Sequence, residues 1–315
     1  MNDEKIDRYL FDPSAPPAEE VQQIEKLLAP HRFDPRANPL RIVPWRRRLV
    51  PLFAAAAVLL LITGAALWLW TWPSQRPWTV VSGSMPTFPV GSAVRASDAL
   101  RVRVAHIGWM QVSEGSVVTL RSTRTNRHRL AVAAGTIHVS VWAPPASIAV
   151  STPEGEVIDL GCEFVLDVHG QVTRLDVLSG WVELDNGFAE VLVPAGATSE
   201  MSASGYPAVP VFKSADPAFR AAVRELEHGS PGAVETVIAK ARRGDVLTLL
   251  LLAQRGMERE RLVQRAAELM PPKSPQTVER ARRGESMAIS EWIGELPLPP
   301  TKSWLRNWRD LFGLR

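Results

Sequence analysis

The chain has 315 residues, with 36 lysines and arginines against 33 aspartates and glutamates and a formal net charge of +3. This balance excludes a dedicated nucleic-acid binder, in which basic residues dominate, so we expect no direct nucleic-acid binding. Hydrophobic residues make up 46% of the chain, which excludes wholesale disorder. The single cysteine, Cys162, excludes an intrachain disulfide and a cysteine-rich metal site.

The first 48 residues predict a helical segment that is too short for a large core of its own. The run Pro16–Glu20 is typical of a helix start, and Pro30 marks the end of that helix. Four apolar residues recur at helical spacing between them and share one face: Val21, Ile24, Leu27 and Leu28. A second short helix is predicted over Asp3–Phe11. Such apolar faces favour docking to a partner protein, and a partly ordered tail is the alternative.

A long uncharged run follows this segment. No residue from Leu49 to Trp70 is charged, and at ~1.5 Å per residue the run spans roughly 33 Å, enough for the hydrocarbon core of a bilayer. Tryptophans flank it, as at the two interfaces of a membrane: Trp45, Trp68, Trp70, Trp72 and Trp78. We therefore predict one transmembrane helix over 49–72, with a buried core helix or a cleaved signal sequence as the disfavoured alternatives.

The flanking charges predict the orientation of this helix. Four arginines lie just before it, Arg41 and those at 46–48, whereas Arg76 alone follows closely. Because positive residues stay on the cytoplasmic side, we expect the N-terminus in the cytoplasm and the C-terminal parts in the periplasm. The sequence thus predicts a single-pass inner-membrane protein.

A proline-rich linker is predicted over 73–96, and a β domain over 97–200. Short runs rich in valine, leucine and isoleucine recur there with glycines between them: Arg101–Ala105, Ser116–Leu120, Thr136–Trp142, Ser147–Ser151, Glu163–Val168, Val172–Leu178 and Trp181–Leu184. Strands at this spacing, separated by turn residues, predict an all-β sandwich, barrel or solenoid.

Residues 201–315 predict a helical domain with an amphipathic tail. Four short helices are expected, each ended by glycine or proline: Asp216–His228, Ala233–Arg243, Val246–Arg255 and Glu258–Met270. From Ser303 the tail places apolar residues on one face: Trp304, Leu305, Trp308, Leu311 and Phe312. This tail packs on its own domain or lies on a membrane surface. The predicted fold class is therefore a multidomain membrane protein with cytoplasmic helices, one transmembrane helix, an all-β domain and a C-terminal α-helical domain.

Candidate catalytic residues are few. Ser84 lies in the string S-G-S-M-P-T, which resembles the nucleophile region of membrane-anchored signal peptidases. That chemistry needs a neutral lysine as base, and the predicted β domain contains no lysine. Asp159, Glu163 and Asp167 have the spacing of one strand face, as a glycosidase would require, but solvated carboxylates explain them better. The six histidines show no paired spacing, so we expect no metal, no cofactor and no enzymatic activity.

Residues 152–164 read T-P-E-G-E-V-I-D-L-G-C-E-F, and they resemble the T-P-x-G-x-V-x-x-L-G-T-x-F strand pair of the FecR domain family. Residues 173–182 and 108–120 resemble two further strand motifs of that family. Five residues of the resemblance determine the fold: Pro153, Gly161, Cys162, Phe164 and Gly180. The two glycines permit tight bends where a Cβ would clash, and Cys162 stands where the family usually has threonine.

The resemblance implies a regulatory function. FecR-family proteins are the extracytoplasmic parts of membrane regulators that pass an outside signal to an alternative sigma factor. On that basis the β domain would sense a ligand or a partner, and the sigma factor would bind four residues: Val21, Ile24, Leu27 and Leu28. The alternative is a non-enzymatic, membrane-tethered envelope scaffold or binding protein.

Overall fold

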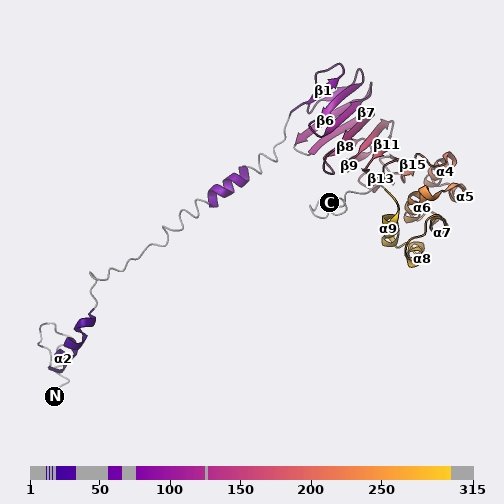
Figure 1. The fold of residues 1–315 in the computed structure, drawn as a ribbon. Helices are drawn as coiled ribbons and strands as arrows, with labels where there is room; N and C mark the ends of the chain where they lie inside the picture. The colour runs from indigo at the N-terminus through magenta and orange to yellow at the C-terminus, as the bar shows by residue number, and fades with distance from the viewer. Residues whose placement is uncertain are drawn as a thin grey trace. The chain divides into compact units, whose positions relative to one another are not determined.

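The structure is a computed structural model that describes residues 12, 14, 16, 19–32, 56–65, 76–124 and 127–298 (Figure 1). It divides into two units, Met1–Leu67 and Trp68–Arg315. Each unit is described by itself below.

The first unit contains helix α2 (Glu19–Leu28), followed by the 3-10 helix η1 (Ala29–His31). Two glutamates lie in the first turn of α2 and Lys26 in the last turn, which suits the dipole of a helix. Helix α2 ends before Pro30, as the sequence predicted, and η1 follows it, because proline is tolerated in the first turn of a helix. The helix predicted over Asp3–Phe11 lies outside the described residues.

The uncharged run is helical over residues 56–65. At ~1.5 Å per residue this stretch covers about 15 Å, half of the ~30 Å hydrocarbon core of a bilayer. Within the described ranges, no helix is both long enough and apolar enough to cross a membrane. This finding overturns the predicted transmembrane helix over 49–72 and, with it, the predicted single-pass inner-membrane localisation. The prediction relied on the length of the uncharged run from Leu49 to Trp70. The part of that run that the structure describes as helix is residues 56–65.

The second unit begins with fifteen strands. Their bounds are β1 (Trp78–Ser82), β2 (Thr87–Phe88), β3 (Ala93–Arg95), β4 (Leu100–Val104), β5 (Gly108–Val112), β6 (Val117–Arg124), β7 (Arg127–Val141), β8 (Ile148–Thr152), β9 (Gly155–Asp159), β10 (Glu163–His169), β11 (Val172–Ser179), β12 (Trp181–Asp185), β13 (Glu190–Pro194), β14 (Ala197–Met201) and β15 (Val211–Phe212). They form a sandwich of two sheets, which is one of the predicted architectures. One sheet has the order β2-β1-β4-β5-β7-β10-β11-β14-β15, and the other has the order β3-β6-β7-β8-β9-β12-β13.

Strand β7 belongs to both sheets. Its first half, up to Ala134, pairs with β6 and β8, and its second half pairs with β5 and β10. The change occurs at Gly135, whose φ is +96°. A Cβ at this glycine would lie 2.4–2.6 Å from atoms of Ser116, so the crossing requires a residue without a side chain.

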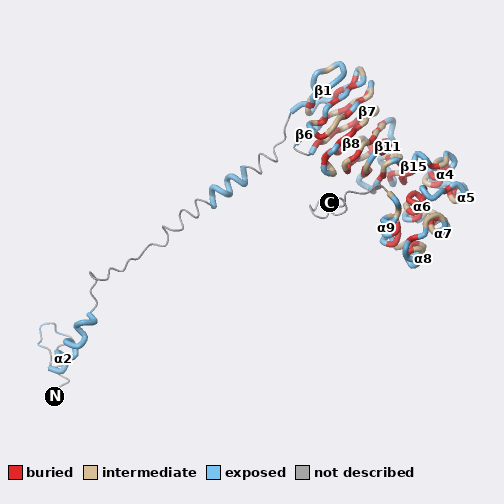
Figure 2. Tube along the Cα trace, viewed as in Figure 1, coloured by how far each residue is buried: buried red, intermediate tan, exposed pale blue. Residues whose placement is uncertain are grey.

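One hydrophobic core cluster joins buried residues of both sheets, and the buried residues of the strands are coloured red in Figure 2. Side chains alternate along the strands, so Val102 and Val104 of β4 are buried whereas Arg101 and Arg103 are exposed. Large side chains that are fully buried come from both sheets: Phe88, Leu100, Met110, Leu120, Leu130, Ile137, Ile148, Phe164 and Leu166.

Six α-helices follow the strands in the described part of this unit: α4 (Pro217–Glu227), α5 (Ala233–Lys240), α6 (Val246–Gln254), α7 (Arg259–Leu269), α8 (Pro275–Arg282) and α9 (Ser286–Glu295). The short 3-10 helix η2 (Arg243–Asp245) precedes α6. They enclose a second core around Phe219 and Trp292, and Val211 of β15 packs into the same core. Strand β15 therefore joins the sandwich, through its pairing with β14, to the helices.

Three strands lie in the segment that the sequence predicted as a linker. Strands β1, β2 and β3 all fall within residues 78–95, and β1 pairs with β4 while β3 pairs with β6. Pro77 precedes β1, and Pro86 and Pro89 lie on either side of the two-residue edge strand β2, where a missing N–H does little harm. The tail from Ser303 lies outside the described residues.

Candidate functional site

The residues of the FecR-like motif meet at the bend between β9 and β10. Asp159 is fully buried there, and its Oδ1 accepts hydrogen bonds from the backbone N–H groups of Gly161 at 3.0 Å and Cys162 at 2.9 Å. The Cys162 thiol also donates to this oxygen. Gly161 has a φ of +88°, which glycine adopts without steric cost. Asp159 thus holds the bend in place from within the protein.

Gly180 lies against this bend. Its φ is +73°, and a Cβ there would lie 2.9 Å from both the Cys162 Cβ and the Gly161 carbonyl oxygen. Phe164 is fully buried in the core of the sandwich, whereas Pro153 lies exposed in the turn between β8 and β9. The structure therefore brings Gly161, Cys162 and Gly180 into contact, and places Pro153 and Phe164 in other roles.

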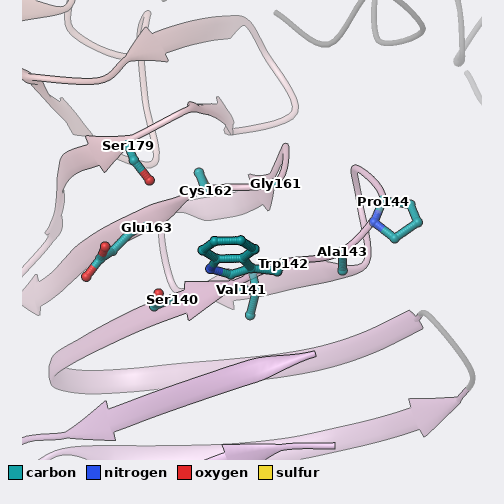
Figure 3. Close-up of a pocket in the computed structure, with 9 residues that line it drawn as sticks. All are labelled: Ser140, Val141, Trp142, Ala143, Pro144, Gly161, Cys162, Glu163 and Ser179. Carbon is teal, nitrogen blue, oxygen red and sulfur yellow. The ribbon is translucent and has the colours of Figure 1, made fainter. Parts of the chain in front are cut away.

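A cavity of about 570 Å³ opens beside the bend (Figure 3). Nine residues line it: Ser140, Val141, Trp142, Ala143, Pro144, Gly161, Cys162, Glu163 and Ser179. Trp142 follows the end of β7 and is 88% exposed, and Figure 3 shows its indole ring in the middle of the lining residues. An exposed tryptophan beside a cavity is typical of a binding surface. The sequence predicted Trp142 as the last residue of a strand, whereas β7 ends one residue earlier, at Val141, and leaves Trp142 exposed.

A row of polar and aromatic side chains leads away from this cavity across the outer face of one sheet. His138 Nε2 lies 2.8 Å from Glu163 Oε1, and the His138 ring packs edge-on against Trp109 with 4.7 Å between ring centres. The Arg101 guanidinium carbon lies 5.0 Å from the centre of the Trp109 ring, a cation–π distance. Together with Trp142, these residues offer surfaces for stacking, hydrogen bonding and ion pairing, which are the means of binding a ligand or a partner.

The four predicted partner-binding residues lie on α2. The structure describes no buried residue in this helix. Ile24, Leu27 and Leu28 are 56%, 75% and 58% exposed, and Val21 is half-buried. Figure 2 shows α2 coloured as exposed. The helix therefore presents an apolar stripe to its surroundings.

Ser84, the candidate nucleophile, is held by an acidic neighbour. Its hydroxyl donates to Asp98 Oδ1 at 2.7 Å and lies 3.0 Å from the Ser97 hydroxyl. The Ser84 backbone N–H also donates to Asp98 Oδ1, at 3.3 Å. These contacts tie together the loop between β1 and β2 and the loop before β4.

The three candidate carboxylates have separate environments. Asp159 is buried in the bend, Glu163 contacts His138, and Asp167 Oδ1 accepts from the Thr136 hydroxyl at 2.6 Å. A different acidic group comes together at β12 and β13, where Glu183, Asp185 and Glu190 place carboxylate oxygens within 4.8 Å of one another. Glu183 is buried, Asp185 is half-buried and Glu190 is exposed, and we assign no metal to them.

His128 is the histidine with the most unusual surroundings. It is 2% exposed in β7, and its Nδ1 lies 2.8 Å from the Thr123 hydroxyl oxygen. Trp78 donates to the same oxygen at 3.3 Å and packs edge-on against the imidazole. Burial first, and then the nearby positive charges of His106 and Arg129, together lower the pKa of His128 to about 4. Its Nε2 is buried and has no hydrogen-bond partner within the described ranges.

The described part of the second unit is a β-sandwich followed by a helical region. No protein-family model matches the chain, and no curated protein matches it. The resemblance to the FecR domain family therefore stays a prediction from the motif.

Two crystal structures of a candidate anti-sigma factor from Parabacteroides distasonis, at 1.65 and 2.50 Å resolution, are similar to part of the chain. In each comparison the sequence identity is 14% and the TM-score is 0.34. The match covers 42% of this chain and 65% and 64% of the two crystallised chains, so it spans less than two thirds of either. A similarity of this size does not by itself establish a common fold or function.

Proposed function

We propose that the protein is a non-enzymatic transcription regulator that binds an alternative sigma factor. Helix α2 would hold the sigma factor, and the β-sandwich would respond to a ligand or a partner at the cavity beside Trp142. The observation that carries the proposal is the apolar stripe of α2, because a helix with this face exposed is suited to lie in the groove of another protein.

The size of the stripe is sufficient for a specific contact. Ile24, Leu27 and Leu28 are each more than half exposed, and burying an aliphatic side chain of this size contributes roughly 1.5–3 kcal/mol. Three such residues therefore supply several kcal/mol, from which the loss of freedom on association must be subtracted. The polar residues on the rest of the helix, such as Gln22 and Lys26, keep that surface in water.

The β-sandwich supports the sensing part of the proposal. The cavity is formed at the bend where Gly161, Cys162 and Gly180 meet, so a ligand there would contact a backbone that leaves no room for a Cβ at Gly180. Trp142 supplies an exposed aromatic surface at low entropic cost, since its side chain has only two rotatable bonds.

The experiment uses the full chain together with each alternative sigma factor of its own host, and measures complex formation and transcription from the matching promoter. The test variant Ile24→Asp/Leu28→Asp places two charges in the apolar stripe. The control variant Gln22→Asp/Lys26→Gln makes the same change in net charge on the polar side of α2. We expect the test variant to lose the complex and to change transcription, and the control to behave as the parent does.

If neither double variant changes binding or transcription, α2 is not the partner-binding element and the proposal is wrong. A binding scaffold without a role in transcription is the rival, and it predicts that deleting residues 19–32 leaves every sigma-dependent promoter unchanged.

A further inference from the structure

A second cavity, of about 390 Å³, lies where the sandwich meets the first helix of the helical region. Strands β11, β14 and β15 and the segment before β15 form one wall, and α4 forms the other. It is lined by Arg174, Asp176, Thr198, Ser199, Glu200, Ala208, Val209, Val211, Lys213, Arg220, Arg224, Glu227 and His228. Its volume falls in the usual range of small-molecule sites, which often lie where two structural parts meet.

Helix α4 turns a basic face to this cavity. Arg220, Arg224 and His228 recur at a spacing of four residues, which aligns them along one side of a helix. The Nε of Arg220 is buried and has no hydrogen-bond partner among the described residues. A buried donor of a charged group that lacks a partner is costly, so the Arg220 Nε–H is available to donate to an acceptor atom of a ligand.

The acidic residues of the cavity already have basic partners. Three ion pairs account for them: Arg174 with Glu200 at 2.7 Å, Lys213 with Asp176 at 2.7 Å, and Arg255 with Glu227 at 2.8 Å. No ion pair within the described ranges involves Arg220 or Arg224, so their positive charge is uncompensated there. Between the charged walls, Ala208, Val209 and Val211 contribute apolar surface.

We propose that this cavity binds a small molecule that carries an oxyanion, with its apolar part against Val209 and Val211. A planar guanidinium presents several N–H donors to a carboxylate or a phosphate in a fixed geometry. Arg220 would donate to the oxyanion from the buried side, and Arg224 would pair with it from the exposed side. This site is separate from the Trp142 cavity, and its existence does not depend on the proposed sigma-factor contact.

The experiment is a calorimetric titration of the full chain with inorganic phosphate and, separately, with citrate. Sodium chloride at the same ionic strength measures non-specific screening. The variants are Arg220→Gln, Arg224→Gln and the control Arg243→Gln, which removes one exposed charge outside the cavity. Because Arg224 is exposed, its replacement leaves the fold intact even if Arg220→Gln does not.

We expect one of the two anions to bind in a saturable manner that chloride does not reproduce. Binding should weaken roughly tenfold or more in each cavity variant, as the loss of a charge-assisted hydrogen bond requires, and should be unchanged in Arg243→Gln. The anion that binds more tightly identifies the phosphate or carboxylate class of the ligand. The inference is overturned if neither anion binds more than chloride does, or if all three variants bind like the parent.

Discussion

Acidification should destabilise the protein through His128 before most carboxylates titrate. The imidazole is 2% exposed, and its pKa is lowered to about 4 from an ordinary value of 6.5, first by burial and then by the charges of His106 and Arg129. The unfolded chain takes up a proton on this residue near pH 6.5, whereas the folded protein takes it up only near pH 4. The stability that this difference provides is therefore complete above pH 6.5 and is lost as the pH falls towards 4.

The magnitude follows from the size of the shift. Each pKa unit corresponds to about 1.4 kcal/mol, so the full shift between 6.5 and about 4 is worth about 3 kcal/mol. Between pH 7.5 and pH 5, the loss in the free energy of unfolding from this one residue is about 2 kcal/mol. That interval lies above the ordinary pKa values of aspartate and glutamate, so His128 can be observed separately from them.

Urea denaturation at half-unit steps from pH 7.5 to pH 5 measures this loss. The variant His128→Gln has no titratable group at the site, so its stability should depend less on pH than that of the parent by about 2 kcal/mol over this interval. The comparison uses differences with pH, which makes the variant's own stability at pH 7.5 irrelevant. Parallel curves for the two proteins would refute the reasoning, as would an NMR titration of His128 with a midpoint near 6.5.

Three further predictions concern stability and binding. Gly180→Ala should lower the free energy of unfolding by more than the roughly 1–2 kcal/mol cost of positive φ, because the new Cβ would clash with the neighbouring bend. Gly187 has a similar φ and open space around it, so Gly187→Ala should lower the free energy of unfolding by that cost alone. Urea denaturation of the two variants compares these losses. Trp292→Ala should lower the free energy of unfolding by about 3–5 kcal/mol, because the side chain is fully buried and donates to the Met270 carbonyl at 3.1 Å. Thermal unfolding followed by circular dichroism should show a lower midpoint for the helices. Trp142→Ala should change stability by less than about 0.5 kcal/mol and abolish binding at the β9–β10 cavity, and a variant that unfolds more easily would show that this tryptophan is structural.

Local sequence patterns predicted helix α4 and strands β10 and β11, whose ends are marked by neighbouring residues in the chain. Helix α4 starts at Pro217 after Asp216, whose Oδ1 accepts from the Ala218 N–H at 2.8 Å, which is the capped start that the sequence indicated. Strands β10 and β11 lie within one residue of their predicted bounds, because alternating apolar residues are bounded there by glycines.

Features that depend on distant partners were missed. Strands β1 and β3 are short and lie in a proline-containing segment. Their pairing with β4 and β6 stabilises them, and no local pattern shows that pairing. The apolar run after Leu49 misled the prediction, because its length was interpreted as the length of a membrane-crossing helix, and no helix within the described ranges is long and apolar enough to cross a membrane. The cavity beside α4 combines Lys213, next to β15, with Arg220 and Arg224 of α4. Its excess of positive charge becomes visible only when the ion pairs of its acidic residues are known.

Strand β7 also limits how this domain can vary in length. Because side chains in a strand alternate between faces, one added residue exchanges the inner and outer positions of everything beyond it. An insertion within β7 could therefore keep the correct register with the partners of only one sheet, either β6 and β8 or β5 and β10. We expect natural variants and engineered insertions to accumulate in the turns between strands, while the spacing on either side of Gly135 stays constant.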